Sequence, residues 1–110
     1  MKKFILIAVS ALAIAAGCNK QPNKLVILHV NDTHSHFEPF VTEDGAIRGG
    51  VIERAAFIDS VRKAVGPENV LLLHAGDFSQ GTSYFTELHG DLEVDVMNAM
   101  GYDATCLGLF

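Results

Sequence analysis

The sequence has 110 residues, 49% of them hydrophobic, and its 13 acidic side chains outnumber its 8 lysines and arginines to give a formal net charge of −5. Proteins that bind a nucleic-acid polymer rely on clustered lysine and arginine, so this acidic balance excludes such a polymer as the expected partner. If the substrate is a small anion, bound metal ions are the expected source of the attracting positive charge.

The amino-terminal residues indicate export. Lys2 and Lys3 precede an apolar run over residues 4–16, which has the length of a signal-peptide core and is well short of the roughly 20 residues that a spanning helix needs. Small residues end the run directly before Cys18, and this pattern resembles the cleavage and lipidation motif of bacterial lipoproteins. The alternative is an ordinary secretory signal with a cysteine at that position by chance.

We therefore expect a signal peptide at residues 1–17, a lipid on Cys18 that attaches the chain to a membrane, and a flexible polar tether at residues 18–24. The predicted location is the cell envelope, in the periplasm or on the cell surface. With Cys18 lipidated, Cys106 has no second cysteine with which to form an intrachain disulfide.

The first predicted element of the folded part is a strand at residues 25–30. Its sequence, LVILHV, is a continuous apolar run rich in β-branched residues, which is typical of an inner strand buried on both faces of a parallel sheet. The polar stretch NDTHSH at residues 31–36 ends the strand. Pro39 and the pair Asp44-Gly45 then predict an irregular loop over about the next dozen residues.

A helix and a second strand follow this loop. Apolar residues recur at helical spacing from Val51 to Val65, charged residues lie on the opposite side, and the pair Gly66-Pro67 provides a stop. The apolar run VLLLHA at residues 70–75 predicts a second buried strand. The order strand, helix, strand is a βαβ unit, in which the two strands are parallel.

The remaining residues predict a shorter helix over residues 92–100, which ends at Gly101, and a third strand within residues 103–107. The acidic side chains of residues 87–95 are expected to be solvated. The predicted fold class is therefore α/β, with few parallel strands and with helices on one side. Such an arrangement leaves an apolar sheet face and a strand edge uncovered.

Candidate metal ligands follow both buried strands. Asp32 and His34 come after the first strand and Asp77 comes after the second. The carboxyl ends of parallel strands lie along one rim of a sheet, where ligands generally bind. Asp32 and His34 are two residues apart, so in extended backbone their side chains point the same way. Mixed oxygen and nitrogen ligands favour Zn, Mn, Fe or Co over Ca.

Three other residues with possible chemistry have simpler interpretations. His29 and His74 lie inside the predicted strands, where a hydrogen-bonded core or supporting histidine is more common than a metal ligand. Cys106 lies in the presumed third strand and is interpreted as a small buried apolar residue.

Three segments resemble a known family. The segments LHVNDTH at residues 28–34 and LHAGD at residues 73–77 resemble the first and second signatures of one branch of the calcineurin-like metallophosphoesterases. The segment MNAMGYDA at residues 97–104 is similar to the stretch that this branch carries just before its third signature. This is the branch of the 5′-nucleotidases and 2′,3′-cyclic-nucleotide phosphodiesterases. The resemblance implies that residues 25–110 are the amino-terminal part of a β-sandwich flanked by helices.

The resemblance also implies an activity. Asp32 and His34 would bind the first of two divalent metal ions, and Asp77 would bridge both ions. The implied reaction is hydrolysis of phosphate esters, with nucleoside 5′-monophosphates or related nucleotides as substrates.

One departure from the family pattern limits this expectation. After Leu107-Gly108 the family continues with Asn-His-Glu, whereas Leu109 and Phe110 follow here. The chain therefore contains no expected catalytic residue besides the metal ligands, and we expect that it does not turn over nucleotides by itself. The alternative is a non-catalytic lipoprotein fragment, which would be either a folded binding module or the product of an interrupted gene.

Overall fold

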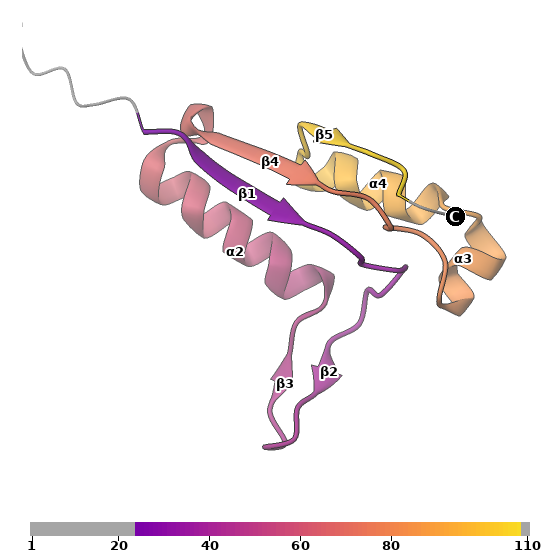
Figure 1. Ribbon diagram of the computed structural model, residues 1–110. Coiled ribbons are helices and arrows are strands. Elements are labelled where there is room, and N and C mark those ends of the chain that lie inside the picture. Colours follow the sequence, from indigo (N-terminus) through magenta and orange to yellow (C-terminus); the bar gives the residue numbers. More distant parts are fainter. Residues whose placement is uncertain (1–23, 109–110) are drawn as a thin grey trace, which may run out of the picture.

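The computed structural model describes residues 24–108. The expected signal peptide at residues 1–17, the lipidated Cys18 and all but the last residue of the tether lie outside this range. Figure 1 shows the element order, in which a parallel sheet alternates with helices and a small hairpin projects from one side. None of the helices between residues 24 and 108 has the length and hydrophobicity that spanning a bilayer requires.

The main sheet has three parallel strands in the order β1-β4-β5. Strand β1 (Val26–Val30) pairs along its whole length with β4 (Val70–His74), and β4 pairs with the short β5 (Ala104–Thr105). Helix α2 (Gly50–Val65) connects β1 to β4. The βαβ unit and the third strand predicted from the sequence are therefore confirmed, although β5 is shorter than expected.

Helix α2 begins and ends where the sequence indicates. The Gly49 amide donates a hydrogen bond to the Glu53 carboxylate, which caps an otherwise unpaired group at the start of the helix. The helix ends at Gly66, and the 3-10 helix η1 (Pro67–Asn69) leads into β4. Within this turn the Asn69 side chain donates to the Val65 carbonyl at 2.7 Å, which satisfies one of the last carbonyls of the helix.

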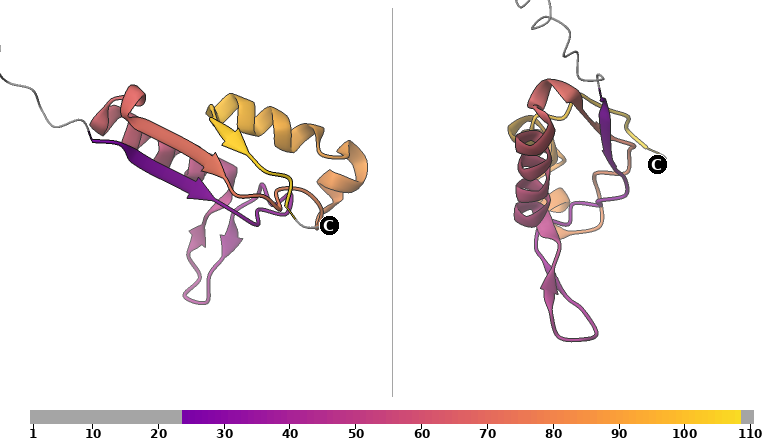
Figure 2. Two further views of the ribbon diagram at one scale, coloured as in Figure 1. Left: turned by 45° about the horizontal axis from the view of Figure 1, so that its top comes forward. Right: turned by 90° about the vertical axis from the view of Figure 1, so that its left-hand side faces the viewer.

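The core lies between the sheet and two helices. Ile58 of α2, Leu72 of β4 and Met100 of α4 (Asp91–Met100) are its buried apolar centre, and Leu72 is fully inaccessible. Arg62 ties the helices together by donating to the carbonyls of Met100 and Gly101 at 2.7 and 2.8 Å. The end-on view of Figure 2 shows the helices on one side of the sheet only.

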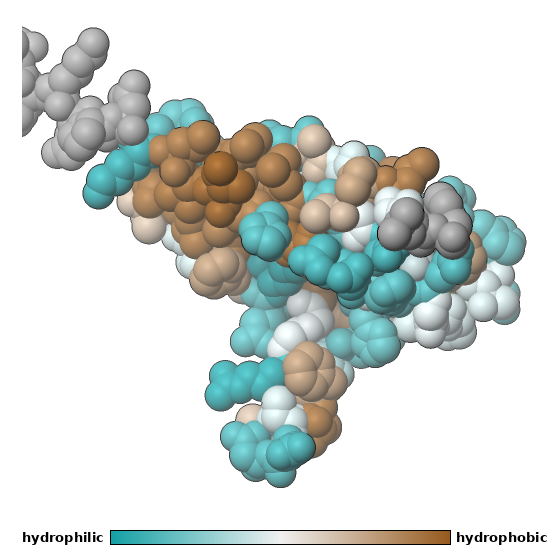
Figure 3. Space-filling view, in the orientation of Figure 1, coloured by the Kyte–Doolittle hydropathy of each residue, from teal (hydrophilic) through white to brown (hydrophobic). Residues whose placement is uncertain are grey.

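The opposite face of the sheet is uncovered. Leu25 and Ile27 are 64% and 57% exposed, and Figure 3 shows a continuous apolar patch over β1 and β4. The expectation that both strands are buried on both faces is therefore wrong for β1, because only one layer of helices packs on the sheet. The uncovered apolar face expected for so few strands is confirmed.

A hairpin of two strands and a short helix lie where the sequence predicted none. Strands β2 (Phe40–Val41) and β3 (Ile47–Arg48) form an antiparallel hairpin within the segment expected to be irregular. Thr42 closes its turn, since its amide donates to the Ala46 carbonyl at 2.8 Å. The short helix α3 (Ser83–Leu88) precedes α4. Both are short and depend on local contacts, so neither has a long hydrophobic period that the sequence would reveal.

Candidate metal centre

The loops that follow β1 and β4 run side by side and continue the parallel pairing of the strands. The Asp32 amide donates to the Gly76 carbonyl at 3.1 Å, and the His34 amide donates to the Asp77 carbonyl at 3.1 Å. The next bond, from the Ser35 amide to the Phe78 carbonyl, measures 2.9 Å. These backbone bonds bring the three predicted ligands to the same end of the sheet.

The backbone at all three predicted ligands is left-handed. The φ angles are 52° at Asp32, 43° at His34 and 50° at Asp77, and Ser35 shares the conformation at 55°. Such angles cost roughly 1–3 kcal/mol for a non-glycine residue, and they persist where the surroundings fix them, often at functional sites. Asp32 and His34 therefore face the same way for a different reason than the extended backbone expected from their spacing.

The three side chains converge. One ligand atom from each of Asp32, His34 and Asp77 lies within 4.8 Å of the others, and Asp77 is half-buried while the other two are exposed. Ligand atoms that share an ion at about 2.1 Å lie up to about 4.2 Å apart, so side-chain movements of less than about 1 Å would close the site. The residues therefore fit a divalent ion with two carboxylates and one imidazole as ligands.

The His74 side chain forms hydrogen bonds with both of these loops. Its Nδ1 accepts from the Gly76 amide at 3.2 Å, and its Nε2 lies 3.1 Å from the Thr33 hydroxyl. Burial lowers the pKa of His74, and so does the nearby charge of Arg54, while Asp32 opposes both. A neutral imidazole that bridges the two loops confirms the interpretation of His74 as a supporting core residue.

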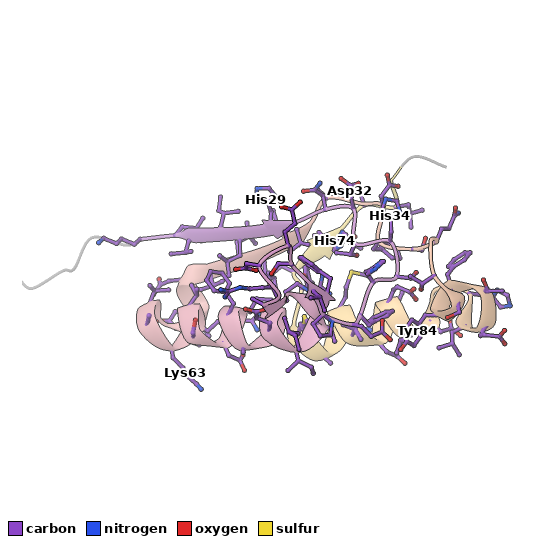
Figure 4. All side chains as sticks on the ribbon, turned by 90° about the horizontal axis from the view of Figure 1, so that it is seen from below. His29, Asp32, His34, Lys63, His74 and Tyr84 are labelled. Atoms are coloured by element: carbon purple, nitrogen blue, oxygen red, sulfur yellow. The ribbon has the colours of Figure 1, made fainter. Side chains whose placement is uncertain are left out.

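The structure corrects three other interpretations. His29 is exposed and not in the core, because it lies on the uncovered face of the sheet. Figure 4 shows it with Asp32 and His34 on the side away from the helices, whereas His74 lies closer to them. Cys106 is also exposed, since it lies beyond the short β5.

Glu93, the third, was expected to be solvated but is only 4% exposed. The sequence signal for its burial was its spacing, because Glu93 stands four residues before the buried Met97 on the inner face of α4. The expectation that Glu93 is solvated rested on its charge alone. Arg54 of α2 reaches the same buried region.

Comparison with known proteins gives a consistent result. The family described as Calcineurin-like phosphoesterase matches residues 25–102. Bovine 5′-nucleotidase (Bos taurus) is 40% identical over 94% of this chain, which corresponds to 18% of that protein. The probable 5′-nucleotidase of Treponema pallidum is 34% identical over 98% of this chain and 21% of its own length. The chain thus spans about a fifth of the length of these relatives.

Two solved structures are similar to this one. The 5′-nucleotidase precursor of Thermus thermophilus superimposes with a TM-score of 0.66 at 38% identity, covering 76% of this chain and 17% of that one. The NAD nucleotidase of Haemophilus influenzae superimposes with a TM-score of 0.68 at 40% identity, covering 76% of this chain and 16% of that one. The α/β fold class predicted from the sequence is confirmed. The matches do not favour the alternative of a non-catalytic lipoprotein fragment or the product of an interrupted gene.

Proposed function

The chain belongs to the calcineurin-like phosphoesterase family, and from this membership we propose that it carries the first ligands of a two-metal site for hydrolysis of nucleotide phosphate esters. The proposed substrates are nucleoside 5′-monophosphates or related nucleotides. The observation that carries the proposal is the convergence of Asp32, His34 and Asp77 at the carboxyl end of the parallel sheet. Sheets of this kind generally bind their ligands at that end.

Each ligand has a proposed role. Asp32 and His34 would hold one divalent ion of the Zn, Mn, Fe or Co class, and Asp77, from the neighbouring loop, would be shared with a second ion. When bound, such ions polarise phosphoryl oxygens and lower the pKa of a coordinated water. The carboxylates also give the site a negative charge, so a nucleotide phosphate is attracted only after metal binds.

The residues around the ligands hold them in place. The backbone bonds between the two loops fix the separation of His34 and Asp77. Burial and Arg54 lower the pKa of His74 and so favour its neutral form, which adds no positive charge that would repel a metal ion. The chain therefore supplies a prearranged set of ligands, which reduces the entropy lost when metal binds.

Metal binding and turnover are proposed to be separable. The family resemblance places further metal-binding and catalytic groups in an Asn-His-Glu segment after Gly108, and Leu109 and Phe110 occupy these positions here. Groups that act as a unit in catalysis cannot be removed singly without losing nearly all activity. The proposed result is a chain that binds metal but does not release phosphate from AMP.

The test measures Co²⁺ binding to the purified protein by visible absorption and by titration calorimetry. Asp77→Asn should weaken binding by at least about 10-fold, because one charged ligand is lost. Asp95→Asn is the matched control, since it removes an exposed carboxylate elsewhere. Equal Co²⁺ affinity in the protein and in Asp77→Asn would exclude the site. Metal-dependent phosphate release from AMP that Asp77→Asn abolishes would instead refute the proposed lack of turnover.

Attachment to a membrane through Cys18 is a separate proposal that rests on the sequence pattern alone. Cys18→Ser should abolish the incorporation of labelled fatty acid and move the protein from the membrane fraction to the soluble fraction. Labelled Cys18→Ser protein would contradict the proposal.

A further inference from the structure

A small cavity lies between the helices and the loop that follows β1 (residues 31–36), which is called the metal loop below. Its polar lining includes Ser35 from the loop, Arg54 from α2 and Glu93 from α4, and its apolar lining includes Phe78 and Met97. Its volume is about 10 Å³, which is close to the least that holds one water molecule.

Three polar side chains around this cavity have buried atoms without a hydrogen-bond partner within the described residues. These atoms are the Ser35 hydroxyl oxygen, the Arg54 Nε and both carboxylate oxygens of Glu93. Ser35 is 1% exposed and Glu93 is 4% exposed. A buried carboxylate without a hydrogen bond is too costly to persist, so these groups require polar partners.

The geometry points to a role for these residues in positioning the metal ligands. We propose that one internal water in this cavity joins the Glu93 carboxylate, the Arg54 guanidinium and the Ser35 hydroxyl, so that the helices hold the metal loop in place. An internal water typically makes about three hydrogen bonds to buried polar groups, and this cavity presents a carboxylate, a guanidinium and a hydroxyl. The inference rests on the proposed metal site.

Ser35 is the point at which this network reaches the ligands. It directly follows His34, and its own backbone has the left-handed conformation that costs free energy. Its amide bonds to the Phe78 carbonyl, and its carbonyl accepts from the Thr82 hydroxyl at 2.9 Å. The backbone of Ser35 is thus fixed by the second loop, and its side chain would be fixed by the helices.

The network also explains why a charged residue occupies the inner face of α4. Glu93 and Arg54 come from different helices, and opposite charges around one water stabilise each other in a region of low dielectric. Removing one partner leaves the other charge buried without compensation. Glu93 and Ser35 act through the loop and do not touch metal or substrate, so they are positioning residues.

A double-mutant cycle on Co²⁺ affinity tests the inference in the full chain. Ser35→Ala and Glu93→Gln should each weaken Co²⁺ binding by about 10–100-fold, which is the range for residues that orient metal ligands. The Co²⁺ affinity of the double variant should about equal that of the single variant that binds Co²⁺ more weakly, because both changes break the same network. The Co²⁺ absorption bands should also shift in each single variant, since His34 is displaced. Asp95→Asn on the same helix should change neither readout.

The outcomes distinguish this inference from the proposed function. If Asp77→Asn abolishes Co²⁺ binding while Ser35→Ala binds with the original affinity and spectrum, the positioning role is wrong and the metal site stands. If Asp77→Asn has no effect, the metal site itself fails. Additive losses in the double variant would also overturn the shared network. Ser35→Ala removes one oxygen only, so it decides the matter even if Glu93→Gln fails to fold.

Discussion

Replacing Gly108 with alanine should damage the candidate metal centre through the backbone. A β-carbon at this position would contact the Asp77 amide nitrogen and carboxylate, and it would lie 2.9 Å from Asp77 Cγ. The amide nitrogen is held by the loop and cannot rotate away as a long side chain would. We therefore expect Gly108→Ala to displace the Asp77 carboxylate from its position beside Asp32 and His34.

The expected effect of Gly108→Ala has two parts, a loss of stability and a loss of metal affinity. Gly108 has a φ of 93°, which disfavours a residue with a β-carbon by roughly 1–2 kcal/mol. The displacement of Asp77 adds a loss of metal affinity of about 10–100-fold, comparable with other changes that disturb the orientation of a ligand. That loss corresponds to about 1.4–2.8 kcal/mol of binding free energy.

Gly90→Ala separates the two parts. Gly90 has a similar φ of 100°, but nothing lies within 4 Å of the position that its β-carbon would take. Both variants should lower the thermal midpoint of the metal-free protein by several degrees, because about 1 kcal/mol shifts it by roughly 4–8 °C in a domain of this size. In calorimetric titrations with Co²⁺, only Gly108→Ala should bind weakly. Equal Co²⁺ affinity in the two variants would refute the reasoning.

Three further predictions concern stability, measured by urea unfolding of the metal-free protein. Leu72→Ala removes a fully buried side chain and should cost about 2–5 kcal/mol, whereas Ile27→Ala on the exposed sheet face should cost far less; similar losses would contradict the described core. Arg62→Met keeps the apolar stem but loses the bonds to the carbonyls of Met100 and Gly101, so we expect a cost of about 1–2 kcal/mol, and none for the exposed Lys63→Met. The lowered pKa of His74 means that the unfolded chain takes up a proton near pH 6.5 before the folded one does, so stability should fall as the pH drops below 6.5. His74→Gln should reduce the loss of unfolding free energy below pH 6.5. An unchanged pH dependence in this variant would show that other groups cause the loss.

Much of the fold could be predicted because its signals are local. The helix α2 has a long amphipathic period with a glycine at each end, and β4 is a continuous apolar run. Short elements gave no such signal: β2 and β3 have two residues each, and pairing with each other is what makes them strands. The burial of β1 was overestimated because an apolar run does not reveal whether a second layer covers it.

The order of the residues was enough to identify the family, the βαβ core and the candidate ligands Asp32, His34 and Asp77, because ligand chemistry and hydrophobic period can be read from neighbouring residues. How these ligands meet depends on tertiary contacts, since their left-handed backbone is held by hydrogen bonds between two loops that are far apart in the chain. The same is true of Glu93, whose charge predicts solvent and whose place on α4 puts it in the interior. Burial depends on what packs against a residue, and a local stretch of sequence does not contain that information.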